Sequence, residues 1–139
     1  MPRAQAEREL LAPRDDVWAF LAEPRHLADW WPGVAAVEPD RRGLAPGARW
    51  QVRRDERPGL LRKARATATL LIRDVDPPRR LAWHDTGERL DIELELRPAD
   101  GHAVARLTIS GPLVLAFRRS LPRIALERLH GLVQTAATL

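Results

Sequence analysis

Cysteine, tyrosine and asparagine are absent from this sequence, and serine occurs only twice, as Ser110 and Ser120. Without cysteine the chain can form no disulfide, no thiolate metal site and no cysteine nucleophile. Neither serine stands in a Gly-x-Ser-x-Gly elbow, so nothing supports a serine-based catalytic triad. The sequence therefore has few side chains that could act as nucleophiles in catalysis.

The histidines are far apart in the sequence and show no metal-ligand spacing: His26, His84, His102 and His130. None belongs to a His-x-x-x-His pair, and we expect each at the surface or at a strand edge. The glycines lie in separate turns rather than in one loop that opens a helix, so no nucleotide fingerprint is present. The sequence predicts neither a metal nor a cofactor.

The chain has 139 residues, 45% of them hydrophobic, which predicts a single domain over residues 1–139 with a substantial core. No window approaches the roughly 18 consecutive apolar residues of a membrane-spanning helix, because charges recur throughout. The first residues are polar and lack the apolar stretch of a signal peptide. We therefore expect a cytoplasmic protein without membrane insertion, either a monomer or a weak homodimer.

The formal net charge is +4, and Lys63 is the only lysine among 23 basic residues. Clustered arginine can indicate a nucleic-acid partner. Here the arginine doublets are scattered and acids lie between them, and the wide use of Arg, Ala, Leu and Pro is typical of a GC-rich genome. We expect no specific nucleic-acid partner.

Two short helices, separated by a proline, are predicted near the N-terminus. Pro13 fixes φ at a helix start, and Asp15 and Asp16 stabilise the positive end of the helix dipole. Pro24 opens a second helical turn, which ends at 30–33. The broken pattern predicts a bent pair of helices.

Alternation of apolar and polar residues at period two predicts strands at about 4–11, 33–38, 48–53, 61–75, 81–84, 90–97 and 103–109. The clearest alternation begins at Leu90 and includes Leu94, with acids on the opposite face. Asp100-Gly101 predicts a hairpin between the last two strands.

From Leu113 to about Thr138 the apolar spacing changes to three and four, which predicts a long helix with a kink or break at Pro122. One strand, two short helices, about six antiparallel strands and a terminal helix make an α+β fold. The terminal helix is the only element long enough to cover the apolar face of a strongly curved sheet.

Three segments resemble a known superfamily: residues 12–34, where a proline-started helix bearing Val17-Trp18 leads to Trp31-Pro32-Gly33-Val34; Gly47 with its strand; and residues 75–83. The sequence resembles the START-like, or SRPBCC, proteins, which include polyketide cyclases and dehydrases, lipid carriers and heat-shock ATPase activators. The resemblance implies a helix-grip fold, in which a curved antiparallel sheet wraps around the C-terminal helix. It specifies function poorly, because members of one fold perform unrelated tasks.

The resemblance also implies an apolar cavity between the sheet and the terminal helix. The small inward residues Ala64, Ala66 and Ala68 would leave space there, and concave apolar space is where ligands bind. The predicted ligand-binding residues are Trp30, Trp31, Trp50, Ala66, Ala68, Trp83, Leu94, Phe117 and Leu121. The competing interpretation is that aromatic side chains fill the gap and leave a solid core.

Acid–base catalysis is the enzymatic alternative, because a cyclase or dehydratase must enolise, protonate and lose water. If Leu81 and Trp83 point inward, Asp85 does too, and a desolvated Asp85 would have a raised pKa. The competing interpretation is that Asp85 only opens the following turn. His84 and Arg106 are further candidates, and Arg106 faces inward only if the last strand has the opposite phase or a bulge.

The missing residue types favour binding over catalysis. The resemblance to polyketide cyclases implies a cavity lined with tyrosine, asparagine and arginine, and the first two are absent here. Trp30 and Trp31, adjacent at a helix end, are expected to point about 100° apart, so that only one is buried and the other lies at the cavity entrance. The sequence predicts a protein that holds a hydrophobic, polycyclic or polyketide-like molecule; a cyclase and a chaperone- or RNA-associated partner protein are the alternatives.

Overall fold

The computed structural model describes residues 2–54, 67–112, 114 and 118–138. Two of the predicted ligand-binding residues, Ala66 and Phe117, lie outside these residues, as do Ala64 and the first part of the strand predicted at 61–75. No helix in the described part of the chain is both long enough and apolar enough to cross a membrane.

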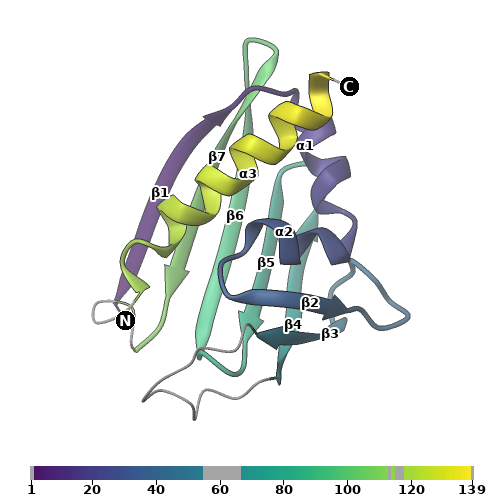
Figure 1. The fold of residues 1–139 in the computed structure, drawn as a ribbon, viewed down its shortest axis with the longest axis vertical. Helices are drawn as coiled ribbons and strands as arrows, with labels where there is room; N and C mark the ends of the chain where they lie inside the picture. The colour runs from purple at the N-terminus through teal and green to yellow at the C-terminus, as the bar shows by residue number, and fades with distance from the viewer. Residues whose placement is uncertain (1, 55–66, 113, 115–117, 139) are drawn as a thin grey trace.

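The described elements confirm the predicted order of strand, short helices, six strands and a long helix (Figure 1). The helices are α1 (Arg14–Leu21), the short 3-10 helix η1 (Pro24–His26), α2 (Leu27–Trp30) and α3 (Leu121–Thr138). The strands are β1 (Arg3–Leu10), β2 (Val34–Glu38), β3 (Arg49–Arg54), β4 (Thr67–Asp76), β5 (Arg80–Asp85), β6 (Leu90–Ala99) and β7 (His102–Ser110). All seven strands form one antiparallel sheet, in the order β1-β7-β6-β5-β4-β3-β2.

The hairpin between β6 and β7 forms at the predicted Asp100-Gly101 turn. Both residues have positive φ, 47° and 82°, as a type I′ turn requires. The turn sets a register in which Leu94 lies opposite Leu107. Because side chains alternate across a strand, this register directs the apolar residues of both strands to one face.

Helix α3 packs on the apolar face of the sheet, chiefly against β1, and also contacts β7, α1 and α2 (Figure 1). Its buried residues recur at helical spacing: Leu121, Ala125, Leu126, Leu129 and Val133. Residues 119–120 form a turn and α3 begins at Leu121, so the chain has the predicted break directly before Pro122, which lies in the first turn of the helix. A missing backbone N–H costs little in the first turn, since that group has no partner within the helix.

The outer face of the sheet carries alternating charges, as the interleaved acids and arginines predict. Arg80 pairs with Glu93 at 2.9 Å and with Asp74 at 3.3 Å, and Glu7 pairs with Arg97 at 2.9 Å. Exposed pairs of this kind contribute at most about 1 kcal/mol each. These pairs offset part of the arginine charge on this face.

Two glutamates of β6, Glu93 and Glu95, interact on the outer face of the sheet. The hydrogen bond between them lowers the pKa of Glu93, helped by the Arg80 guanidinium. The same bond raises the pKa of Glu95, helped by partial desolvation and by repulsion from Glu93. Of the two carboxyl groups, Glu95 is therefore the one that takes up a proton first as the pH falls.

Replacing Glu95 with glutamine is expected to stabilise the protein at neutral pH and to have little effect in acid. Because its pKa is raised on folding, Glu95 adds stability below its ordinary pKa of 4.5 and loses that contribution as the pH rises through the raised value. Glutamine keeps an N–H donor at every pH. The melting temperature should therefore rise at about pH 8 but not at about pH 4, while Glu127→Gln serves as a surface control. An equal shift at both pH values would contradict the assignment.

Candidate functional site

The inner face of β5 presents two apolar residues and one acid in a row. Leu81, Trp83 and Asp85 are all buried, with exposed fractions of 4%, 3% and 3%. This confirms the predicted inward phase of β5. The row runs from the middle of the core to the end of the sheet where both β3 and β5 have their last residues.

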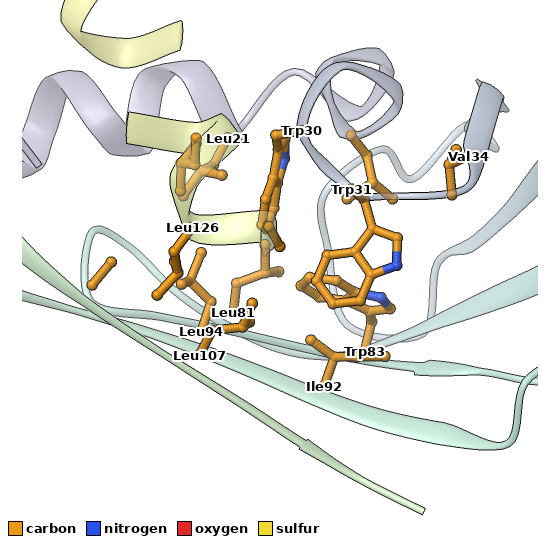
Figure 2. Packing of buried hydrophobic residues seen from close by; sticks show 14 of the residues in the cluster. Leu21, Trp30, Trp31, Val34, Leu81, Trp83, Ile92, Leu94, Leu107 and Leu126 are labelled. Carbon is orange, nitrogen blue, oxygen red and sulfur yellow. The ribbon is translucent and has the colours of Figure 1, made fainter. Parts of the chain in front are cut away.

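Three tryptophan rings meet above this row. Trp83 contacts Trp31 edge to face at 5.3 Å between ring centroids and Trp30 at 6.3 Å, and the two neighbours contact each other at 5.5 Å (Figure 2). Such pairs add roughly 0.5–1.5 kcal/mol beyond the burial of their area. We refer to these residues as the tryptophan cluster; they connect α2 and the segment after it to the sheet.

The prediction that only one of Trp30 and Trp31 is buried is wrong. Trp30 is 1% exposed and Trp31 is 4% exposed. The prediction assumed that both residues are helical, whereas α2 ends at Trp30 and Trp31 has extended backbone, with φ −86° and ψ 118°. The change of backbone conformation turns both side chains toward the sheet.

Between the short helices and the sheet a small void remains, with a volume of about 10 Å³. It is lined by Leu21, Leu27, Trp30, Trp50, Ile72, Leu81 and Trp83. A void of this size holds about one water molecule. Trp50 is fixed at its edge, because its Nε1 donates a hydrogen bond of 2.7 Å to the carbonyl oxygen of Gly43. In the described part of the chain, aromatic and aliphatic side chains thus fill most of this space.

The other predicted ligand-binding residues that the structure describes are also inside the core. Leu94 is buried beside the tryptophan cluster, in the same cluster of apolar residues as Ala68. Leu121 begins α3 and is buried at the start of that helix.

Asp85 is buried, but both of its oxygens have partners. Its Oδ1 accepts hydrogen bonds from the backbone N–H groups of Gly87 (2.9 Å) and Glu88 (3.1 Å), which close the turn between β5 and β6. Its Oδ2 lies 2.5 Å from Nη2 of Arg54 at the end of β3. Asp85 therefore faces inward, as predicted, and also forms the turn, while its catalytic role stays a prediction.

Two further residues extend this pair into what we call the ion cluster: Arg54, Asp85, Glu88 and Arg118. The Glu88 carboxylate accepts a hydrogen bond of 2.8 Å from Nε of Arg118 and a second one from its Nη2, and Glu88 also lies 3.6 Å from Nη1 of Arg54. The turn approaches closely at Gly87, where a Cβ would lie 2.8 Å from that of Ala68. Only glycine fits there without displacing its neighbours.

Sequence reasoning missed Arg54, Glu88 and Arg118. A signal for Arg54 was available, because period-two alternation along β3 puts it on the same face as Trp50 and Val52, both buried. The contacts of Glu88 and Arg118 join residues 30 positions apart, and no local pattern indicates them.

His84 and Arg106, the other two candidate catalytic residues, lie on the outer face of the sheet. His84 Nδ1 lies 2.9 Å from Oδ1 of Asp91, and Arg106 Nε donates a hydrogen bond of 3.3 Å to Glu7. The last strand therefore has the predicted phase. The structure does not bring these two residues together with Asp85, and among the described residues it shows no group of three or more histidines and acids that could hold a metal.

The fold is similar to those of several solved bacterial proteins. A protein from Nitrosomonas europaea is 18% identical with a TM-score of 0.72, and the match covers 99% of this chain and 97% of that one. The Aha1 dimer from Colwellia psychrerythraea is 15% identical with a TM-score of 0.70, with 96% of each chain covered. An AHSA1-like protein from Aeromonas hydrophila is 15% identical with a TM-score of 0.73, with 97% and 94% covered. At these identities the likeness concerns the fold alone.

Sequence comparison is more specific. No curated protein matches this sequence. A family model described as "Polyketide cyclase / dehydrase and lipid transport" matches residues 1–137. The match covers all seven strands and all but the last residue of α3, and on this basis the chain belongs to the polyketide cyclase/dehydrase and lipid transport family.

Proposed function

We propose that the protein binds a planar hydrophobic small molecule, polycyclic or polyketide-like, against the tryptophan cluster. The observation that carries the proposal is the meeting of three indole rings beside a void lined only by apolar residues. Edge-to-face rings offer flat apolar surfaces on which another planar ring system can stack. The family description, which includes polyketide cyclases and lipid transport, supports the same class of ligand.

The void is too small for such a ligand, so a side chain must move. Trp31 is the candidate, because it follows the end of α2 in extended backbone and precedes Gly33, whose φ is 85°. A tryptophan ring buries about 150–250 Å², worth roughly 4–6 kcal/mol at about 25 cal/mol per Å². A ligand ring in the same position would recover most of that energy, which makes the exchange feasible.

Truncating Trp31 is expected to strengthen the binding of a planar ligand. Trp31→Ala removes the ring that the ligand must displace, so emodin, an aromatic polyketide, should bind about tenfold more tightly than to the wild type, equivalent to ~1.4 kcal/mol. Native mass spectrometry and fluorescence titration measure the affinity. Bound emodin should also recover part of the stability lost with the ring.

Trp18→Ala is the matched control, because Trp18 is partly buried outside the tryptophan cluster. It should leave the affinity for emodin unchanged. Absence of saturable binding to both the wild type and Trp31→Ala would contradict the proposal.

A cyclase or dehydratase activity remains the enzymatic alternative, and it now depends on Asp85, since His84 and Arg106 lie on the other face.

A chaperone- or RNA-associated role and the predicted monomer or weak homodimer stay predictions. The similar Aha1 protein from Colwellia psychrerythraea is a dimer. Size-exclusion chromatography with light scattering would determine the oligomeric state of this chain.

Replacing Asp85 with asparagine separates a structural from a catalytic role. We expect Asp85→Asn to lower the stability by about 3 kcal/mol. The substitution removes the carboxylate 2.5 Å from the Arg54 guanidinium and leaves that largely buried charge only the more distant Glu88, at 3.6 Å. Product analysis on a linear poly-β-keto thioester should give the same products with both proteins at a temperature at which both are folded. Loss of a product that the folded wild type forms would instead support acid–base catalysis by Asp85.

A further inference from the structure

The ion cluster begins where the apolar row of β5 ends. Asp85 lies two residues beyond Trp83 on the inner face, a step of about 7 Å along a strand. The indole nitrogens of Trp31 and Trp83 both lie on the side of the rings that faces away from Leu81 and Leu94 (Figure 2). The inner face thus changes from apolar to polar over one inward step, directly beside the tryptophan cluster.

The inner and outer halves of the ion cluster differ in exposure. The side chains of Arg54 and Asp85 are 12% and 4% exposed, whereas those of Arg118 and Glu88 are 24% and 22% exposed. Breaking the inner pair would leave a buried charge unpaired, which is costly. The outer pair reaches solvent, so Glu88 can exchange its protein contacts for water at lower cost.

The Glu88 carboxylate occupies a site between two guanidinium groups. Arg118 binds it through both Nε and Nη2, and Arg54 Nη1 lies 3.6 Å from Oε1, the oxygen that also accepts from Nη2 of Arg118. Two-point binding of a carboxylate by a guanidinium is geometrically specific and stronger than a neutral hydrogen bond. The chain's own side chain therefore fills a site suited to carboxylates.

We propose that the ligand is an amphipathic acid, whose carboxylate replaces that of Glu88 between Arg54 and Arg118 while its apolar rings lie against the tryptophan cluster. This inference rests on the proposed function and adds the chemical class of the ligand's polar end. The residues that bind this end are Arg54 at the end of β3 and Arg118, three residues before α3 begins.

Charge balance explains why an acid is required. The two arginines and two acids of the ion cluster are neutral as a group. When Glu88 moves into water, Arg54, Arg118 and Asp85 keep one uncompensated positive charge in a half-buried site. A ligand carboxylate restores neutrality, whereas an alcohol leaves the charge unpaired and an amine adds to it.

Two probes that differ only at the polar end test the inference: anthracene-2-carboxylate and 2-(hydroxymethyl)anthracene. Fluorescence titration should show that the wild type binds the acid at least about tenfold more tightly than the alcohol. Arg118→Gln should abolish most of this preference without weakening the alcohol. Arg123→Gln, which removes a guanidinium from an exposed pair with Glu127, is the matched control and should retain the preference.

A second variant gives a test of the opposite sign. Glu88→Gln removes the charge that competes for the guanidinium groups, so its affinity for the acid should exceed that of the wild type. Equal binding of acid and alcohol by the wild type, or weaker acid binding by Glu88→Gln, would overturn the inference while leaving the proposed function standing. Binding of neither probe, by the wild type or by Trp31→Ala, would overturn both.

Discussion

Trp83 projects from the centre of the sheet into the space beneath α2, where its ring meets Trp30 and Trp31 edge to face. This contact joins the short helices to the inner face of the sheet. The backbone conformation of Trp31, the small void and the position of Trp50 all depend on it. Because the backbone is extended at Trp31, the adjacent rings of Trp30 and Trp31 can both turn toward Trp83. The small void lies beside these packed rings, and Trp50, which its hydrogen bond to Gly43 holds in place, lines that void.

The inner face of β5 combines two environments that are usually kept apart. Its apolar part packs with the tryptophan cluster, and its end is an acid fixed by Arg54 and by the backbone of the next turn. A molecule with flat apolar rings and one acidic group matches both environments in the same order. Held in that order, the molecule would be bound and oriented, which is what a carrier requires.

Much of the fold follows from local pattern. Period-two alternation and the Asp100-Gly101 turn predict the sheet, the phase of β5 and the outward position of Arg106, because each depends on neighbouring residues. The errors arise where backbone conformation changes or where contacts join distant residues. Trp31 is not helical, although its place after Trp30 suggests that it is, and the arginine partners of Asp85 and Glu88 lie 30 or more positions away in the sequence. Residue spacing alone therefore does not predict the ion cluster.

The five tryptophans allow a direct test, because each indole N–H gives its own signal in a ¹⁵N–¹H correlation spectrum. Titrating the wild type with emodin should shift the signals of Trp30, Trp31 and Trp83 saturably, with one common dissociation constant, and leave that of Trp18 in place. A titration in which no signal of the tryptophan cluster moves, or in which Trp18 shifts as much as they do, would contradict binding at this site.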